Sequence, residues 1–206
     1  TVFNEQSILS LHVDKLKKIS MRIAIDDNDI SDDAFTFTNL ITKPLIEFIR
    51  WVHLLPASEN HHHNGIGGLF SHSLDVGLLS LIQAYDSELA PIGYQDEEVQ
   101  RKKAYLYAAF ICGLVHDAGK IYDVDVVSSD TLKTTTWNPT AQSLLDWCNS
   151  ENVKSYEIHW RVRRVNQHNI WSSVFLERIL NPTCLRFLGV VSRERIYDRM
   201  LSSLNS

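Results

Sequence analysis

The chain has 206 residues, 44% of them hydrophobic and 22% charged, a composition that fits a globular protein with one sizeable core and excludes a disordered or fibrous chain. No run of about 18 apolar residues is present, so we expect no membrane span. The net charge of -5 is uneven: residues 153–206 carry 9 Lys or Arg against 4 Asp or Glu, whereas residues 1–152 carry 11 against 21. The basic C-terminal part indicates either a contact surface for a phosphate backbone or an ordinary solvated face.

The cysteines and the start of the chain bear on the compartment. Cys112, Cys148 and Cys184 are odd in number, widely spaced and free of any Cys-x-x-Cys pair. We therefore predict neither a disulfide framework nor a thiolate zinc site, and a reducing cytoplasm fits best. The chain begins at Thr1 without an initiator Met or a signal peptide, so we expect a cytoplasmic piece of a longer protein.

The first part of the chain predicts two helices. Apolar residues at helical intervals run through residues 5–23 and stop at an acidic stretch. We expect residues 1–36 to form a helical N-terminal extension. A second helix is expected over 38–55, because Pro44 is close enough to its first turn to be tolerated and Pro56 follows its end.

The rest of the chain is also expected to be largely helical. Apolar residues recur at intervals of three and four over 69–89 and 95–118, which predicts two long core helices. Alternating valines and a Thr-rich run over 123–136 predict a small β-hairpin. Further helices are expected from residue 138, over 171–180 and over 193–204. The predicted fold class is mainly α, a helical bundle with a small β-hairpin insertion.

Histidine is concentrated in a few segments that are rich in glycine or charge. Six of the nine histidines are His61, His62, His63, His72, His116 and His168, and Asp117 directly follows His116. Imidazole and carboxylate groups at this density indicate a bound divalent metal ion. Because His72 begins one long helix and His116-Asp117 ends the other just before Gly119, packing of the two helices can bring these side chains together. Taken singly, a core histidine or a helix-terminal carboxylate is the commoner explanation of each residue.

The run from His116 to Lys120, His-Asp-Ala-Gly-Lys, resembles the HD superfamily of metal-dependent phosphohydrolases. The resemblance implies a helical, HD-domain-like fold in which His72, His116 and Asp117 bind the metal and Lys120 lies on the phosphate side. It makes Lys120 and Asp117 the expected catalytic residues. The ion, Mn, Mg, Fe or Zn, would polarise a phosphoryl oxygen and lower the pKa of a bound water, which gives phosphoester hydrolysis.

A narrower resemblance is carried by residues 55–76, LPASENHHHNGIGGLFSHSLDV. This block is similar to the N-terminal domain of TraI-like conjugative relaxases of the MobH group, which pair a triple histidine with an HD motif. The segments around Trp137 and from Trp160 to His168 extend the resemblance over residues 40–190. It implies that residues 1–206 form one HD-like relaxase domain that nicks single-stranded or supercoiled DNA at a transfer origin, with relaxosome or conjugation proteins as partners.

The triple histidine and the later candidates are weaker ligands on the sequence alone. Three successive side chains point in different directions, so His61, His62 and His63 cannot all bind one ion, and we expect one or two of them to do so. The alternative is that they cap and pack the Gly-rich loop. His168 is expected as a final metal ligand, or else as a surface histidine at a helix start. Asp198 fits a solvated helix face better than a metal site.

Basic and aromatic residues near His168 are candidates for nucleic-acid contact. Arg161, Arg163 and Arg164 are expected to contact DNA phosphate, since guanidinium groups match its oxygens bidentately. Ion pairing with nearby acids is the equal alternative. Trp160 and Trp171 can stack bases, although tryptophans that flank an amphipathic helix are more often core residues.

The nucleophile is left unassigned by the sequence. A relaxase keeps the cut strand end, which usually requires a protein nucleophile such as Tyr. Tyr122 and Tyr156 are available, but each fits a structural role better. Two other functions stay open: HD-type hydrolysis of nucleotides or oligonucleotides, and a DNA-binding or assembly module without catalysis.

Overall fold

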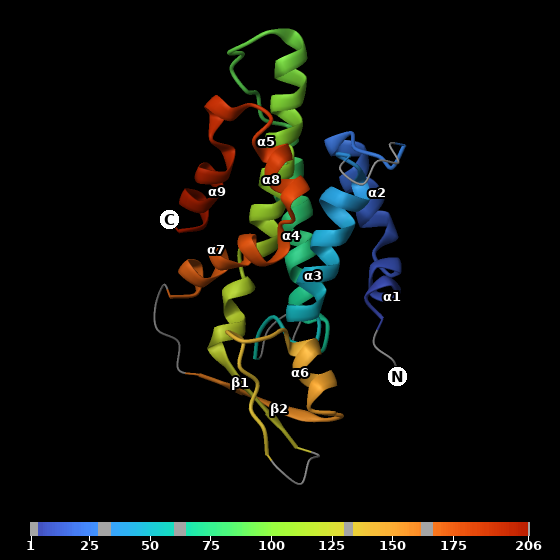
Figure 1. The fold of residues 1–206 in the computed structure, drawn as a ribbon, viewed down its shortest axis with the longest axis vertical. Helices are drawn as coiled ribbons and strands as arrows, with labels where there is room; N and C mark the ends of the chain where they lie inside the picture. Colours follow the sequence, from blue (N-terminus) through green and yellow to red (C-terminus); the bar gives the residue numbers. More distant parts are fainter. Residues whose placement is uncertain (1–3, 29–33, 60–64, 130–133, 162–166, 206) are drawn as a thin grey trace.

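The computed structural model describes residues 4–28, 34–59, 65–129, 134–161 and 167–205, and these fold mainly into helices (Figure 1). The elements are α1 (Glu5–Ser10), α2 (Val13–Ile23), the π-helix η1 (Thr38–Thr42), α3 (Lys43–Val52), α4 (Gly68–Tyr85), α5 (Gln95–Val115), the 3-10 helix η2 (Ala118–Asp123), β1 (Val124–Ser128), α6 (Leu144–Ser150), β2 (Tyr156–Trp160), α7 (Gln167–Ile179), α8 (Pro182–Leu188), the 3-10 helix η3 (Ser192–Glu194) and α9 (Ile196–Leu204). The predicted class, mainly α with a small antiparallel sheet, is confirmed.

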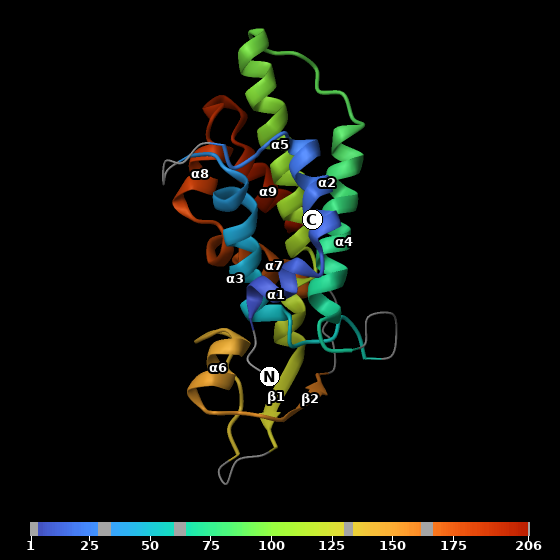
Figure 2. The ribbon, with the colours of Figure 1, turned by 90° about the vertical axis from the view of Figure 1, so that its right-hand side faces the viewer.

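The two longest described helices, α4 and α5, run antiparallel side by side through the bundle (Figure 2). Glycines allow their backbones to approach closely. A Cβ atom at Gly113 would lie 2.9 Å from the Cα of Gly77 and 2.5 Å from the Oγ of Ser80, and one at Gly77 would lie 3.1 Å from the carbonyl oxygen of Phe110. This seam fixes the N-terminal end of α4 beside the C-terminal end of α5.

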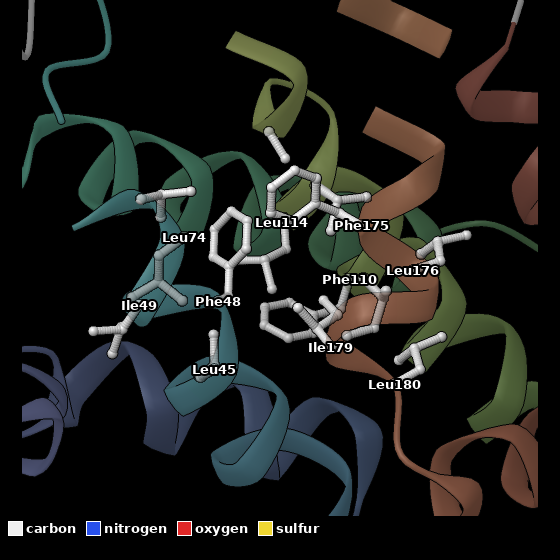
Figure 3. Packing of buried hydrophobic residues seen from close by; sticks show 14 of the residues in the cluster. Leu45, Phe48, Ile49, Leu74, Phe110, Leu114, Phe175, Leu176, Ile179 and Leu180 are labelled. Carbon is white, nitrogen blue, oxygen red and sulfur yellow. The ribbon is translucent and has the colours of Figure 1, made fainter. Parts of the chain in front are cut away.

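Aromatic and aliphatic side chains from four helices form the core between α3, α4, α5 and α7 (Figure 3). The rings of Phe48 in α3 and Phe175 in α7 meet edge to face, with centroids 6.0 Å apart. Leu74, Phe110 and Leu114 complete this part of the core, and all five side chains are fully buried. Burying one such side chain stabilises the fold by about 1.5–3 kcal/mol. The core therefore holds α7 against the same end of α5 that meets α4.

The single helix predicted over residues 5–23 is wrong, because the chain turns between α1 and α2. The backbone N–H groups of Leu11 and His12 donate to the carbonyls three residues earlier, which tightens the turn. Ile8 and Ile19 are buried on either side of the break, so both helices pack on one core. The apolar pattern therefore continues through a turn that it does not reveal.

The predicted second helix begins with a wider turn and ends earlier than expected. Pro44 has no N–H to donate to the carbonyl of Leu40, and the N–H of Lys43 instead reaches the carbonyl of Thr38 across a π turn. Helix α3 then ends at Val52, before the predicted end at residue 55.

The sheet is antiparallel, but its second strand is not the predicted one. β1 pairs with β2 in a register from Val124 opposite Trp160 to Ser128 opposite Tyr156. Within the described residues, the Thr-rich run contributes one isolated bridge, between Val127 and Thr136. Two backbone hydrogen bonds, from Ser128 to Thr135 and from Trp137 to Val126, flank this bridge. The hairpin predicted over 123–136 is thus confirmed only over a short stretch, and the full partner strand of β1 is β2. The helix expected from residue 138 begins later, at Leu144.

The C-terminal helices are fastened to α5 by a buried carboxylate. Glu194 accepts a 2.5 Å hydrogen bond from the hydroxyl of Tyr105 and lies 3.5 Å from the guanidinium of Arg101. Helix α8 was not predicted, although Asn181 caps it and Pro182 starts it, a recognisable N-terminal signal. Within the described part of the chain, no helix has the length and apolar character needed to cross a membrane.

Candidate metal centre

Two helix ends bring three potential metal ligands together. His72 lies one turn into α4, which begins after Gly67 in the left-handed region at φ 83°. His116 caps the C-terminal end of α5, and Asp117 starts the turn into η2. One donor atom from each of these side chains lies within 4.8 Å of the others, and among the described residues no other cluster of this kind is found. The meeting of His72 with His116 and Asp117 that two packed helices would allow is observed.

The Asp117 carboxylate is the centre of the cluster. Its Oδ2 atom lies 3.1 Å from Nε2 of His72, 3.2 Å from Nε2 of His116 and 2.6 Å from Nζ of Lys120. The Lys120 ammonium also donates to the carbonyl oxygen of Ala57, at 3.1 Å. One carboxylate oxygen thus faces two imidazoles and one ammonium.

The hydrogen bond of the second ring nitrogen fixes the orientation of His116. Its Nδ1 lies 2.7 Å from the carbonyl oxygen of Gly113, which can only accept, so Nδ1 carries the proton. Nε2 therefore faces the Asp117 oxygen across 3.2 Å, either through a second N–H or through a lone pair that a shared cation can bind. A backbone carbonyl behind the ring is the usual support of a metal-bound histidine, so these residues fit a metal ion.

The charges in the cluster also suit metal binding. Burial alone would raise the pKa of Asp117, but the contacts with His116 and Lys120 outweigh it and hold that pKa well below its ordinary value. Burial lowers the pKa of His72, and the nearby Asp117 offsets this only in part. Asp117 is therefore ionised and His72 neutral near pH 7, the forms that bind metals. The His72, His116 and Asp117 side chains keep 31%, 33% and 15% exposure, so solvent reaches the cluster.

A buried serine in α7 holds the ligand turn in place. The Ser172 hydroxyl donates to the carbonyl oxygen of His116 at 2.8 Å and accepts from the N–H of Gly119 at 3.1 Å. Ser172 was not among the predicted site residues. It shares one helical stripe with the buried Phe175, Leu176 and Ile179. A polar residue within an apolar stripe is the sequence signal that could have identified it.

Several predicted ligands cannot be placed. His61, His62 and His63 lie outside the described residues, and so do Arg163 and Arg164. His168 lies in the first turn of α7, but its side chain is not among those described. Their roles stay predictions.

Two other charged candidates are placed by the structure. Arg161 pairs bidentately with the Asp125 carboxylate and keeps 57% exposure of its side chain. It follows strand β2, so pairing with a nearby acid, the alternative to phosphate contact, is observed. Asp198 is exposed and pairs with Arg195, as expected for a solvated helix face.

The two tyrosines considered as nucleophiles both make structural contacts. The Tyr156 hydroxyl donates to the carbonyl oxygen of Leu54 at 2.7 Å, and burial raises its pKa above the ordinary value. The Tyr122 hydroxyl accepts a 2.9 Å hydrogen bond from Arg178. These contacts agree with the structural roles favoured for both residues.

Comparison with protein families gives a match that covers most of the chain. Residues 11–205, nearly the whole chain, match the model of a family described as "Putative helicase". No curated protein matches the chain.

Proposed function

The chain belongs to the TraI_2 family, and from that membership and the ligand cluster we propose that it is a metal-dependent domain that nicks DNA for conjugative transfer. The observation that carries the proposal is the meeting of His72, His116 and Asp117 beside Lys120. The motif resemblances to the HD superfamily and to relaxases of the MobH group support the same reading.

Some residues of the cluster would bind the metal ion and another would contact the substrate. His72, His116 and Asp117 would hold a divalent ion, which when bound supplies Lewis-acid activation of a phosphoryl oxygen or of water. Lys120 brings a positive charge within 2.6 Å of Asp117, so its ammonium can donate to a phosphate oxygen as negative charge develops there. Part of each of the three side chains stays exposed, so the cluster is open to further ligands and to substrate.

The family description mentions helicases, but the sequence supports a different chemistry. The only Gly-Lys pair is Gly119-Lys120, and it is followed by Ile121 rather than Ser or Thr. The phosphate-binding loop G-x-x-x-x-G-K-[ST] typical of nucleotide-hydrolysing motors is thus absent from these 206 residues. The proposed reaction is therefore placed at the ligand cluster and not at a nucleotide-binding loop.

We propose that the triple histidine adds one or two ligands from the segment that leads into α4. On the N-terminal side of this segment, the Ala57 carbonyl accepts a hydrogen bond from Lys120, a residue of the cluster. At the other flank, the Gly67 N–H donates to the carbonyl of His53 at 2.7 Å, just before the helix that carries His72. His168, in the first turn of α7, is proposed as a further ligand because Ser172 of the same helix binds the His116 turn.

The proposal is tested by nicking of a supercoiled plasmid that carries the transfer origin, with and without Mn²⁺. Wild-type protein should nick only with the ion, and His116→Ala should lose both nicking and Mn²⁺ binding measured by calorimetry. His159→Ala is the matched control, because His159 is an exposed histidine on β2 that pairs with Glu157 and is not part of the ligand cluster. Equal nicking by His116→Ala and wild type would refute the metal role.

Product analysis separates nicking from simple hydrolysis. A protein–DNA adduct that survives denaturation supports a relaxase, whereas free nucleoside monophosphate or inorganic phosphate supports a nucleotide hydrolase. Salt-sensitive DNA binding with no metal uptake would instead indicate a non-catalytic binding module.

A further inference from the structure

Trp171 is a large aromatic residue that the core leaves partly uncovered. It lies on α7, whose residues Phe175 and Ile179 are fully buried, yet Trp171 keeps 42% exposure. Its ring stacks on Tyr122, with centroids 4.5 Å apart and planes inclined by 33°. The expectation that this tryptophan is a core residue is therefore wrong. The structure instead presents an indole backed by a second ring.

The two rings belong to residues that are close in the chain to those of the ligand cluster. The next residue after Trp171 is Ser172, which binds the His116 carbonyl and the Gly119 N–H. Tyr122 follows Lys120 by two residues on η2. Both rings are thus tied through short backbone connections to the turn that carries His116, Asp117 and Lys120.

The ring beneath Trp171 is held in a fixed position. Arg178 donates to the Tyr122 hydroxyl at 2.9 Å and to the carbonyl oxygen of Pro139 at 3.0 Å. The guanidinium of Arg178 also lies over the ring of Trp51, 4.0 Å from its centroid. A stacking surface held from below in this way loses little conformational freedom when it binds a ligand.

A backbone hydrogen bond ties a basic residue to the neighbour of Tyr122. The backbone N–H of Arg161 donates to the carbonyl oxygen of Asp123, at 2.7 Å, and Asp123 adjoins Tyr122. The Arg161 side chain is exposed. Lys120 and Arg161 are thus tied to the residues that adjoin Tyr122, although the Arg161 guanidinium is paired with Asp125 and would have to exchange this partner for a phosphate. Basic side chains near an aromatic face are typical of sites that bind a base together with its neighbouring phosphates.

We propose that Trp171, backed by Tyr122, is a stacking platform for one nucleobase of a single-stranded DNA whose phosphate enters the ligand cluster. The inference rests on the proposed function and makes its substrate more specific. Bases within a duplex are stacked on each other and do not offer a free face, so the platform favours single strands. Trp171 binds the DNA base and takes no part in the bond cleavage.

The test measures binding of a short, fluorescein-labelled single-stranded oligonucleotide by anisotropy in EDTA, where no metal-dependent cleavage occurs. Stacking of one base on an aromatic side chain is worth about 1–3 kcal/mol, which corresponds to roughly 5- to 150-fold in Kd. Trp171→Ala should weaken binding by at least about fivefold, the low end of that range. Trp171→Phe keeps a ring on Tyr122 and should retain most of the affinity, which also controls for folding.

An abasic version of the same oligonucleotide makes the test specific for stacking. Wild type and Trp171→Ala should bind the abasic strand equally. Equal affinity of the two proteins for the normal strand, or an equal loss on both strands, would overturn the inference, and so would a preference of wild type for duplex DNA. Nicking by the wild type with Mn²⁺ is measured in a separate assay. If the wild type nicks DNA and Trp171→Ala binds the oligonucleotide as tightly as the wild type, the platform is refuted and the proposed function stands.

Discussion

Gly113→Ala is expected to separate the two helices that bring the ligands together. A methyl group at this position would lie 2.9 Å from the Cα of Gly77 and 2.9 Å from the Cβ of Ser80. Carbon atoms in favourable contact lie about 3.5–4.0 Å apart, so both neighbours must move away by roughly 0.6–1 Å. Neither atom is at the end of a flexible side chain, and the shift must therefore pass into the backbones of α4 and α5.

The expected magnitude follows from two opposing effects. Extra methyl groups in a well-packed core cost about 1–3 kcal/mol, whereas replacing Gly by Ala inside a helix gains up to about 1 kcal/mol. The net destabilisation is then about 1–2 kcal/mol, or a fall in Tm of roughly 2–8 °C for a chain of this size. A displacement of this kind between His72 and His116 should also weaken divalent-ion binding about tenfold, equivalent to about 1.4 kcal/mol.

The assay is thermal unfolding followed by circular dichroism, first in EDTA and then with Mn²⁺. The EDTA measurement reports the packing cost alone. The increase in Tm on adding Mn²⁺ reports affinity, because an ion that binds only the folded state stabilises it according to its concentration relative to Kd. Gly113→Ala should lower the Tm measured in EDTA and should also reduce the increase in Tm that Mn²⁺ causes.

Gly189→Ala is the matched control. A Cβ atom there would meet only the carbonyl oxygens of Leu185 and Arg186, at 3.4 and 3.6 Å, far from the cluster. It should leave the Mn²⁺-induced increase unchanged. If Gly113→Ala instead unfolds at the wild-type temperature with an undiminished increase, the close α4–α5 contact does not position the ligands.

Three further changes test other contacts. Ser172→Ala removes the hydrogen-bond partner of the His116 carbonyl and the Gly119 N–H, so the free energy of unfolding should fall by about 1–3 kcal/mol. An unchanged denaturation midpoint would contradict this. The hydrogen bond from Tyr105 lowers the pKa of Glu194. The ionised Glu194 therefore stabilises the fold fully above the ordinary glutamate pKa, and this stabilisation is lost as the pH falls through the lowered pKa of Glu194. The Tm advantage of wild type over Glu194→Gln should therefore shrink below about pH 5, and a constant difference in thermal scans down to about pH 3 would refute it. Tyr156→Phe should lower stability by about 1 kcal/mol in urea titrations but leave nicking intact, and loss of nicking in the folded variant would make Tyr156 a candidate nucleophile.

The features that could be predicted from the sequence depend on long helices with a regular apolar pattern. The patterns that became α4 and α5 have His72 at the start of one and His116 at the end of the other. Two long neighbouring helices pack antiparallel when a short connection joins them, so these ends had to meet. The three-ligand cluster was predictable for that reason.

The parts that did not follow depend on contacts between distant segments. β2 was missed although Tyr156, Ile158 and Trp160 alternate with the exposed Glu157 and His159, because a run of five residues is short and its partner strand β1 lies far away in the sequence. The exposure of Trp171 was missed because the helical pattern of α7 does not say where its core-facing stripe stops. The turn between α1 and α2 was hidden because both helices bury the same side.

The ligand cluster depends on segments that are far apart in the chain. Within it, 45 residues separate His72 from Asp117, and Ser172, which fastens the turn, comes 56 residues after His116. No short piece of the polypeptide brings His72, His116 and Asp117 together, so the ion that we propose for this cluster would meet the complete set only after α4 and α5 have docked. Metal uptake would then be a late event in refolding, and a truncated or misfolded chain would lack the proposed site.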